Sequence, residues 1–428
     1  MTERTNAPAT LDELRLPPSF VADHAIRTLG YQGALSVLDM AKHWHVHDAV
    51  AADVVDSLKA AGIVRSDAGP TDFDRLGRVR LTETGQARLA TARERTWYAG
   101  PLPVSLARLD EAAGRTSVRA SRETLREKML ALEIDERAAD EMGQALAGGR
   151  TMAIAGVADD EQAAIAAAAG GALEGETQLP FAIFAAGAVI RVFDPQHHRT
   201  LEHEGSPGET LDVLRGHGEA RSQWATVRPP VVQLAGGVLP SDVTPAYDEE
   251  ARFYLAPPPC AAWGGVLCVL DSAVNGEALI ELANTWLIPG RQGVGIIKLR
   301  TGERIELPWQ ASVMLLNAGA DALPPEVRRA VPYYVDITQL EGGAMEAFVH
   351  RRLGTASDLT QQMATSLATL LEQARLTTRV AAATAAQYLR DRMAYDGAAF
   401  DATATVLRQA VEFAADEAPA PRSRRRAA

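Results

Sequence analysis

Residues 151–163 read TMAIAGVADDEQA, and this stretch decides the fold. The apolar run Thr151–Ala155 is short, uncharged and followed by a glycine, a pattern typical of a strand buried on both faces. Gly156 permits a tight turn into an alanine-rich segment, Ala163–Ala169. Further short apolar segments alternate with helical patterns: Phe181–Phe184, Val189–Phe193, Val231–Leu234, Gly265–Leu270, Ala278–Leu287 and Ser312–Leu316. This alternation predicts an α/β domain with a mainly parallel sheet.

The sequence on both sides of this domain is helical. Residues 18–98 show three helical patterns, two short strand patterns and a fourth helix, the order of a winged-helix domain. The sequence GPLP (100–103) then indicates a linker. We expect the α/β domain to span residues 99–341 and an all-helical domain to span 342–416. The arginine-rich end, 417–428, is expected to be a disordered tail.

Composition excludes several classes of protein. Of the 428 residues, 47% are hydrophobic and 23% are charged, which excludes fibrous and wholly disordered chains. The net charge of −12 repels phosphate backbones on average, so nucleic-acid binding needs a local basic patch. Cys260 and Cys268 lie in an apolar stretch, which favours buried free thiols in a reducing compartment.

No part of the sequence predicts export or a membrane span. The first residues, MTERTNAPATLDELRLPP, lack the apolar core of a signal peptide. The longest uncharged run, Phe253–Leu270, contains three consecutive prolines at 257–259, which break a spanning helix. We therefore expect a soluble, cytoplasmic protein.

A series of short blocks resembles a known family. In chain order the blocks are YAGPLPV (98–104), IRVFDP (190–195), RPPVV (228–232), FYLAP (253–257), GGVL (264–267), NTWLIP (284–289), LRTGE (299–303) and LN (316–317). Their order and spacing are similar to those of bacterial AAA+-type ATPases with an N-terminal winged helix, described as predicted ATPases with chaperone activity and linked to Flp pilus assembly. The resemblance covers roughly residues 18–395. It implies a P-loop NTPase core, a C-terminal helical lid, Mg·ATP as cofactor and assembly into oligomers.

The phosphate loop that this resemblance implies is degenerate. The motif G-x-x-x-x-G-K-[ST] holds phosphates with backbone amides and a lysine, and Mg²⁺ with a hydroxyl. Gly156 keeps the first glycine, but Glu161, Gln162 and Ala163 replace the second glycine, the lysine and the hydroxyl. Three carboxylates would face the phosphates of ATP: Asp159, Asp160 and Glu161. Like charges about 4 Å apart repel by a few kcal/mol near a surface. We expect these carboxylates to take the place of the phosphate and to cap the next helix.

Other residues of the implied ATPase site are partly retained. The strand Val266–Asp271 matches the family strand that ends in two acidic residues, but Leu270 replaces the first of them. The remaining carboxylate, Asp271, cannot assemble a phosphoryl-transfer site alone. The resemblance assigns sensor-1-like, finger-like and sensor-2-like roles to four further residues: Asn317, Arg328 with Arg329, and Arg379, respectively.

Two histidine groups raise the question of a metal site. His43, His45 and His47 surround a predicted helix end, where alternate side chains diverge, and no cysteine or carboxylate cluster completes a set of ligands. His197 and His198, with His203 nearby, are expected in a solvated loop. We therefore expect no bound metal.

The winged helix raises DNA binding as an alternative. Its predicted wing carries three cations: Arg75, Arg78 and Arg80. Its third helix, however, presents three aspartates beside one lysine, where phosphate contacts need cations. This acidic helix favours protein docking over DNA.

The favoured hypothesis is an AAA+-like pseudo-ATPase that acts through protein contacts and binds no cofactor. Its expected partner is a homologous active ATPase in a mixed oligomer, with Arg328 or Arg329 reaching the neighbour's nucleotide. Two alternatives stay open. The first is a nucleotide-binding ATPase with chaperone-like remodelling activity, and the second is a winged-helix DNA-binding regulator.

Overall fold

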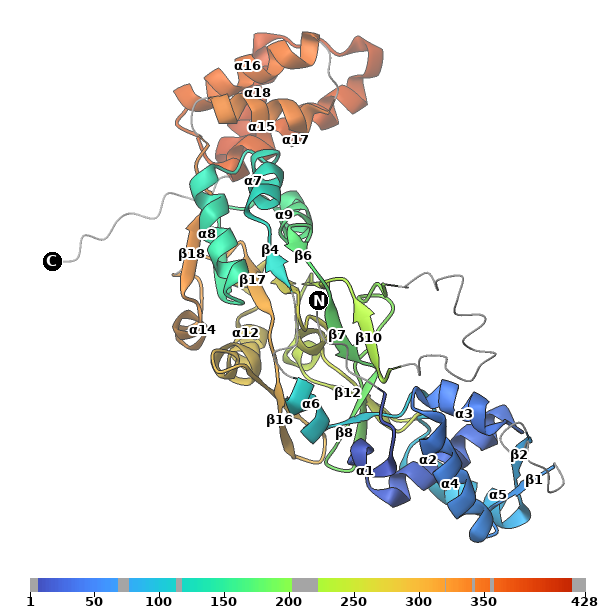
Figure 1. Cartoon of the computed structure of the whole chain (residues 1–428). Coiled ribbons are helices and arrows are strands. Elements are labelled where there is room, and N and C mark those ends of the chain that lie inside the picture. Colours follow the sequence, from blue (N-terminus) through green and yellow to red (C-terminus); the bar gives the residue numbers. More distant parts are fainter. Residues whose placement is uncertain are drawn as a thin grey trace.

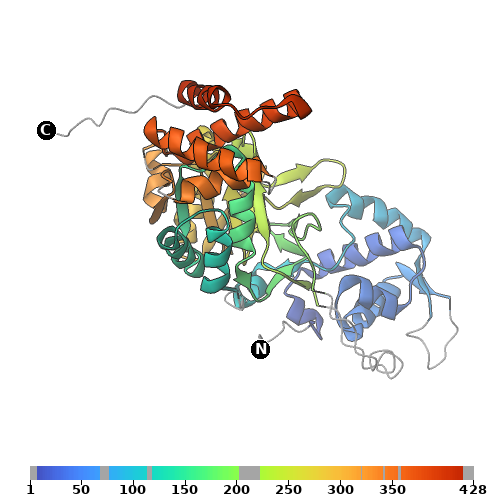
Figure 2. The same ribbon diagram turned by 90° about the horizontal axis from the view of Figure 1, so that it is seen from above.

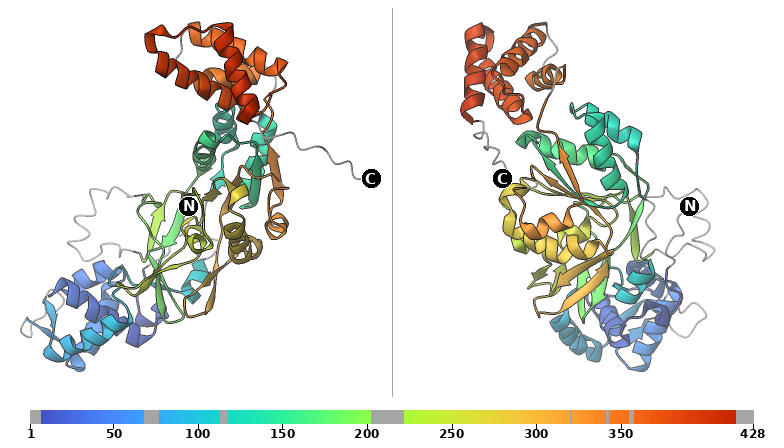
Figure 3. Two further views of the ribbon diagram at one scale, coloured as in Figure 1. Left: turned by 180° about the vertical axis from the view of Figure 1, so that it is seen from behind. Right: turned by 90° about the vertical axis from the view of Figure 1, so that its left-hand side faces the viewer.

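The computed structural model describes residues 7–67, 77–112, 118–201, 222–319, 321–340, 343–354 and 358–417. An α/β core lies between an N-terminal helical unit and a C-terminal helical unit, which occupy opposite ends of the molecule (Figure 1), as the views in Figure 3 also show. From above, the N-terminal unit lies beside the core and the C-terminal helices lie over it (Figure 2). Arg75, His203 and the predicted tail beyond Glu417 lie outside the described residues.

The core is built on a five-stranded sheet in which every pair of neighbouring strands is parallel. Its order is β11 (Val231–Leu234), β14 (Val266–Val269), β17 (Ser312–Leu316), β5 (Thr151–Ala155) and β18 (Tyr333–Asp336). The first of these strands in the chain, β5, lies between the last two. Such a reversal of strand order opens a crevice at the carboxyl ends of the strands, where α/β proteins bind ligands.

Alternate side chains of this sheet enter two separate cores, because successive strand residues point to opposite faces. Met152, Ile154 and Met314 pack in one core with α7 (Arg122–Leu130), α8 (Glu136–Ala147) and α9 (Gln162–Gly170). Ala153, Val313 and Leu315 pack in the other core, to which α12 (Gly276–Leu282), the π-helical η4 (Ala283–Leu287) and α14 (Pro325–Ala330) contribute. Both faces are therefore covered, which confirms the predicted parallel sheet in an α/β domain.

A second five-stranded sheet lies between the parallel sheet and the N-terminal unit. Two of its strands correspond to the predicted segments Phe181–Phe184 and Val189–Phe193, but the sequence did not predict that they form a separate sheet. Its order is β12 (Ala246–Asp248), β13 (Phe253–Leu255), β9 (Ala188–Arg191), β8 (Ala182–Ala185) and β3 (Val104–Ser105). It mixes parallel and antiparallel pairs. These strands are two to four residues long, too short for a clear alternating pattern.

Short antiparallel pairs and helices complete the core. The pairs are β4 (Arg119–Ala120) with β6 (Leu173–Glu174), β7 (Thr177–Pro180) with β10 (Trp224–Val227), and β15 (Val294–Lys298) with β16 (Arg304–Pro308). The helices are α6 (Leu106–Ala112), η1 (Asp159–Glu161), η2 (Pro240–Val243), α11 (Pro258–Ala261), η3 (Ser272–Val274) and α13 (Ile288–Gly290). Cys260 and Cys268 are both buried and free, as predicted, and burial raises the pKa of each thiol to about 12.

The N-terminal unit has the order of elements expected from the sequence. It comprises α1 (Leu11–Leu14), α2 (Pro18–Gln32), α3 (Val37–Trp44), α4 (Asp48–Ala60), β1 (Val64–Ser66), β2 (Val79–Leu81) and α5 (Glu83–Arg95). Ser36 and Thr82 cap α3 and α5 by accepting hydrogen bonds from backbone N–H groups three residues on. Trp44 is fully buried at the centre of its core.

The segment expected to be a linker is packed between the N-terminal unit and the core. Leu102 is fully buried, and its N–H donates to the Trp44 carbonyl at 2.9 Å. His24 and His43 bond the carbonyls of Gly100 and Ala99 at 3.0 and 2.5 Å. Arg27, also fully buried, donates from Nε to the Tyr98 carbonyl at 2.9 Å. These contacts fix the N-terminal unit on the core.

The C-terminal unit is entirely helical, as predicted, within the described part of residues 342–416. It comprises α15 (Gly343–Leu353), α16 (Asp358–Gln373), α17 (Arg379–Asp396), η5 (Gly397–Ala399) and α18 (Ala404–Glu417). Its apolar core includes two residues of the α/β domain: Ala158, from the turn after β5, and Leu340, from the segment that leaves β18. Among the described helices, none combines the length and apolar character needed to cross a bilayer.

Candidate functional site at the carboxyl edge of the parallel sheet

The residues that the sequence singled out from three distant segments follow neighbouring strands at one edge of the sheet. Gly156 follows β5, Asp271 follows β14 by two residues, and Asn317 follows β17. All three have positive φ angles, of 83°, 47° and 56°. Left-handed backbone turns the chain sharply away from each strand. The predicted strand Val266–Asp271 ends earlier, at Val269, so Leu270 and Asp271 belong to the turn.

Gly156 is required by close packing. A Cβ atom at this position would lie 2.3 Å from both Cα and Oγ1 of Thr338, in the segment that leaves β18. The Thr338 carbonyl in turn accepts a hydrogen bond from the N–H of Arg379 at 2.8 Å. This glycine therefore lets the turn after β5 approach the start of the C-terminal unit.

The carboxylates after Gly156 do not cap the helix that follows, contrary to the expectation from the sequence. Neither η1 nor α9 has a side-chain cap. Glu161 is only 3% exposed, and its carboxylate turns toward the C-terminal unit. Burial removes the hydration of a carboxylate, so a buried carboxylate is stabilised more by a cationic partner than by the N-terminus of a helix.

Three arginines of the C-terminal unit surround Glu161. Arg351 Nη2 donates to Glu161 Oε1 at 2.8 Å, and Arg379 Nη1 lies 3.3 and 3.2 Å from the two carboxylate oxygens. Arg352 Nη2 is 3.7 Å from Oε2. Arg379 is 1% exposed and also donates to the carbonyls of Leu132 and Glu133, at 2.9 and 2.6 Å.

Two more carboxylates complete the group. Arg352 forms a two-pronged pair with Asp160, at 2.5 and 2.6 Å, and Arg351 pairs with Glu133 at 2.7 Å. The ring of Phe348 lies beneath all three guanidinium groups, 4.7 to 5.4 Å from their central carbons. We call this set the ion cluster: Glu133, Asp160, Glu161, Phe348, Arg351, Arg352 and Arg379. It joins the turn after β5 to α15 and α17.

Burial and pairing compete in setting the pKa values of the cluster. Burial lowers the pKa of Arg379, and the charge and hydrogen bonds of Glu161 oppose that shift. Burial would raise the pKa of Asp160, but the hydrogen bonds and charge of Arg352 outweigh it, and the pKa lies below its usual value. The hydrogen bonds of Glu133 and Glu161 outweigh burial at Arg351 and raise its pKa. The pairs therefore hold their charged forms together.

Gln162, which the sequence resemblance aligns with the phosphate-loop lysine, binds Asp271. Its Nε2 donates to Asp271 Oδ1 at 2.5 Å, and its Oε1 accepts from the Asp271 backbone N–H at 2.7 Å. Gln162 is 1% exposed. Ala163 is exposed, and its side chain offers no metal ligand. The side-chain amide of Gln162 therefore satisfies both the carboxylate and the backbone N–H of Asp271.

The residues predicted to act as arginine fingers lie elsewhere. Arg328 and Arg329 are exposed in the last turn of α14, the helix that leads to the opposite end of β18. Within the described chain neither side chain has an ion pair, and their backbone carbonyls accept from Tyr334 and Arg291. Of the predicted site residues outside the phosphate-loop turn, Arg379 alone joins Glu161.

The histidines have structural partners. His45 Nδ1 bonds the Ser222 carbonyl at 2.9 Å, and His198 is buried between the Asp194 N–H and the Ala261 carbonyl. The solvated loop expected around His198 is therefore wrong for that residue. Nowhere in the described ranges do three metal-ligating side chains gather. On the wing, Arg80 pairs with Asp67 at 2.7 Å.

Sequence reasoning missed Arg351 and Arg352. They form the end of a charged helical stretch, HRRLG (350–354), which reads as a solvated helix end. The signal that could have found them is charge balance, because a degenerate turn with three consecutive carboxylates needs cations from elsewhere in the chain.

Comparison with known proteins does not identify the family of this chain. No family model and no curated protein matches the sequence. Among solved structures, the chain is similar to one in the complex between subunits BchI and BchD of magnesium chelatase, with 14% identity and a TM-score of 0.27. That alignment covers 69% of this chain and 93% of the other. The fold is therefore assigned from its own strand order, which is compatible with an AAA+-like core.

Proposed function

We propose that this protein is an AAA+-like pseudo-ATPase that acts through protein contacts. In this proposal residues 18–98 are a winged helix, the core is a P-loop NTPase domain without its loop chemistry, and the C-terminal unit is the lid. The observation that carries the proposal is the position of Glu161. This buried carboxylate, in the turn that the resemblance aligns with a phosphate loop, is held by three arginines of the C-terminal unit.

The residues present do not fit Mg·ATP. Phosphate binding at a strand-to-helix turn needs free backbone amides and a cation, and hydrolysis needs metal ligands and a carboxylate that polarises water. Glu161 would repel a phosphate at close range, and Arg379 already binds Glu161. Asp271 is bound to Gln162. No step of phosphoryl transfer is therefore assigned to this site.

In this proposal the ion cluster takes the structural role of a bound nucleotide. In an active enzyme of this class, the resemblance implies that nucleotide bridges core and lid. Here the ion cluster bridges the same two parts without a ligand, which favours a constant arrangement of the C-terminal unit. A constant arrangement suits a scaffold or an assembly subunit, and a homologous active ATPase remains the expected partner. The exposed Arg328 and Arg329 are free to contact such a partner.

The DNA-binding alternative has weaker support. Of the wing cations in the described residues, Arg80 is paired with Asp67. On α4, the one lysine, Lys59, lies 3.8 Å from Asp56. A helix that neutralises its own cation offers little to a phosphate backbone.

Calorimetric titration with Mg·ATP tests the proposal. The wild-type protein is expected to give no binding heat. The variant Glu161→Gly, Gln162→Lys, Ala163→Thr rebuilds the phosphate loop and frees the three arginines, so it should bind ATP. A matched control, Asp159→Gly, removes an exposed carboxylate of the same turn and should behave as wild type. Micromolar binding by the wild type would overturn the proposal.

A further inference from the structure

The joint between the N-terminal unit and the core is held by histidine side chains. His24 of α2, His43 of α3 and His45, the residue after α3, each bond a backbone carbonyl across this joint. The accepting carbonyls are those of Gly100, Ala99 and Ser222, at 3.0, 2.5 and 2.9 Å. A carbonyl oxygen only accepts, so each ring donates from the nitrogen that faces it. We call residues 98–103 the joint segment, since two of these bonds and the buried Leu102 lie on it.

His24 differs from the other two histidines in its burial. Its side chain is fully buried, whereas His43 and His45 are half-buried. Because Nε2–H of His24 donates to the Gly100 carbonyl, the neutral ring carries no proton on Nδ1. This Nδ1 atom is sealed from solvent and has no hydrogen-bond partner among the described residues. A second proton on the ring would therefore be a buried N–H with neither an acceptor nor water to stabilise it.

The charged groups that face His24 also oppose a positive charge on it. Arg27, one turn further along α2 and fully buried, donates to the Tyr98 carbonyl at 2.9 Å. His43 approaches the same joint segment from α3. Burial, then the charges of Arg27 and of His43, lower the pKa of His24 well below its ordinary value of 6.5, and the bond to Gly100 only partly opposes them.

The other groups around the ring provide no counter-charge. Aromatic rings surround it, with centroids at 6.1, 5.8 and 6.0 Å: those of Phe20, Trp44 and Tyr98. The Tyr98 hydroxyl stays neutral, since burial raises its pKa. Asp23, the residue before His24, instead forms ion pairs with Arg88 and Arg95 of α5, at 3.6 and 3.0 Å. Within the described ranges no carboxylate bonds the His24 ring.

We propose that His24 is a proton-sensitive clamp: protonation of its ring opens the joint segment and frees the N-terminal unit from the core. The neutral ring fits the closed joint, where its one N–H is satisfied by Gly100. The protonated ring needs water or an acceptor at Nδ1, which only an open joint supplies. The same opening exposes Leu102, which the closed joint buries.

The pH range of this clamp follows from the two states of the ring. In the open joint the hydrated ring titrates near its ordinary value, about pH 6.5, whereas in the closed joint it stays neutral well below that. Above about pH 6.5 His24 is neutral in both states, and opening does not depend on pH through this residue. Below it, opening takes up one proton, so the opening equilibrium rises about tenfold for each pH unit until the closed form also titrates.

Amide hydrogen exchange of the full chain over a series of pH values, corrected for the intrinsic pH dependence of exchange, tests this. The reporter is the N–H of Leu102, which donates to the Trp44 carbonyl in the closed joint. In the wild type its opening should rise about tenfold per pH unit below about pH 6.5. His24→Gln keeps an N–H donor for Gly100 but does not titrate, so this rise should disappear.

An exposed histidine of the same sequence run provides the matched control. His47 caps α4, with Nδ1 accepting from the Ala49 N–H. His47→Asn removes a titrating ring and keeps a side-chain cap, so Leu102 should open with the wild-type dependence on pH.

Two measurements on the wild type distinguish release of the unit from loss of its fold, and they hold even if His24→Gln fails to fold. Exchange inside α4 and α9 should not show the rise seen at Leu102. Small-angle X-ray scattering should give a larger radius of gyration below the transition than above it. An opening of Leu102 that is independent of pH, an equal rise in α4, an unchanged radius of gyration, or a rise that persists in folded His24→Gln would overturn the proposal.

Discussion

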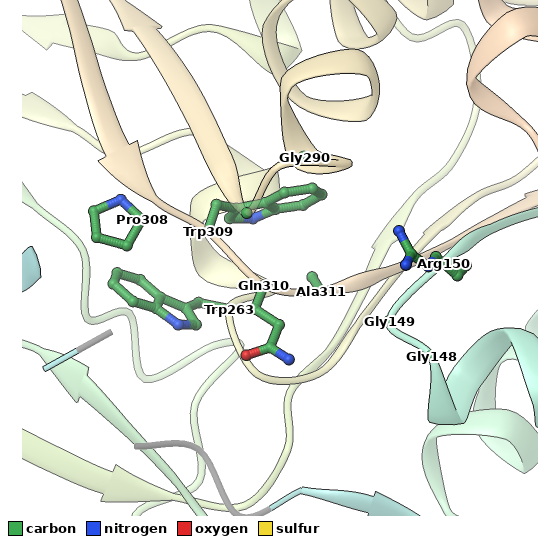
Figure 4. A pocket seen from close by; sticks show the side chains of 10 residues that line it. Gly148, Gly149, Arg150, Trp263, Gly290, Pro308, Trp309, Gln310 and Ala311 are labelled. Atoms are coloured by element: carbon green, nitrogen blue, oxygen red, sulfur yellow. The ribbon is translucent and has the colours of Figure 1, made fainter. Parts of the chain in front are cut away.

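The polar side chains at the two edges of the parallel sheet differ in their burial and in their partners. At the carboxyl edge, Glu161, Gln162 and Arg379 are almost fully buried and each binds a partner inside the chain. At the amino edge, the side chains of Arg150 and Gln310 are exposed to solvent beside the buried ring of Trp263 (Figure 4). In this fold the carboxyl edge is the expected ligand site. The comparison teaches that the sheet edge at which ligands are expected can be closed by the chain's own side chains.

Removing Glu161 should produce the largest effect. Glu161→Ala leaves three arginines without their shared carboxylate, and breaking a buried ion pair from one side costs about 3–5 kcal/mol. We expect a loss of this size in the free energy of unfolding, measured by urea denaturation. Asp159→Ala, two residues earlier and exposed, should change it by less than about 0.5 kcal/mol. Similar losses of stability in both variants would contradict the claim that Glu161 holds the ion cluster together.

A phosphate anion should rescue part of that loss. In Glu161→Gly the three arginines keep their positions around an empty anion site, so inorganic tripolyphosphate should bind there. Binding to the folded state alone stabilises by about 2.7 kcal/mol at a hundredfold excess over Kd. We expect a rise in melting temperature that the wild type does not show at the same ionic strength. An equal rise in both proteins would show that the arginines hold no specific anion site.

The dependence of stability on pH tests the contribution of Asp160 to the ion cluster. Because Arg352 lowers the pKa of this carboxyl in the folded state, its contribution is fully present above the ordinary carboxyl pKa of about 4. The contribution is lost as the pH falls through the folded-state value. Urea denaturation below about pH 4 should therefore show a steeper fall in wild type than in Asp160→Asn. Parallel pH profiles of the two proteins would show that the charge of Asp160 does not contribute to stability.

The smallest effect is expected at the predicted finger residues. Arg328 and Arg329 are exposed and have no ion pair within the described chain, so the double variant Arg328→Ala, Arg329→Ala should change stability by less than about 0.5 kcal/mol. Its ion cluster should be intact, as judged by an unchanged melting temperature. A loss of more than about 2 kcal/mol would mean that these arginines hold the fold and are not free for a partner.

The sequence predicted some features of the fold much better than others. Uninterrupted apolar runs such as Ser312–Leu316 are informative because both faces of their sheet are buried. The second sheet was not predicted as a separate sheet because its other strands, such as Val104–Ser105, are too short to show a pattern. The supposed linker at 100–103 proved buried, since glycine and proline mark irregular backbone without saying what packs on it.

The candidate site shows the same limit at the level of side chains. The resemblance singled out Gly156, Glu161 and Gln162, because the phosphate-loop motif with which it aligns them has a fixed spacing. It could not locate Arg351, which lies 190 residues from Glu161 in the chain. The expectation that the carboxylates cap α9 failed because local reasoning could not include cations brought by a distant helix. Ion pairs between residues so far apart in the chain depend on the fold and leave no local pattern in the sequence.

Amide hydrogen exchange with and without Mg·ATP tests the central claim most directly, that a protein carboxylate takes the place of a phosphate between core and C-terminal unit. We predict that ATP changes exchange in neither α9 nor α15 of the wild type. We also predict that Glu161→Gln, which removes the charge but keeps the shape, speeds exchange in both helices together. Protection of α9 by ATP in the wild type, or no change in α15 in Glu161→Gln, would contradict the claim.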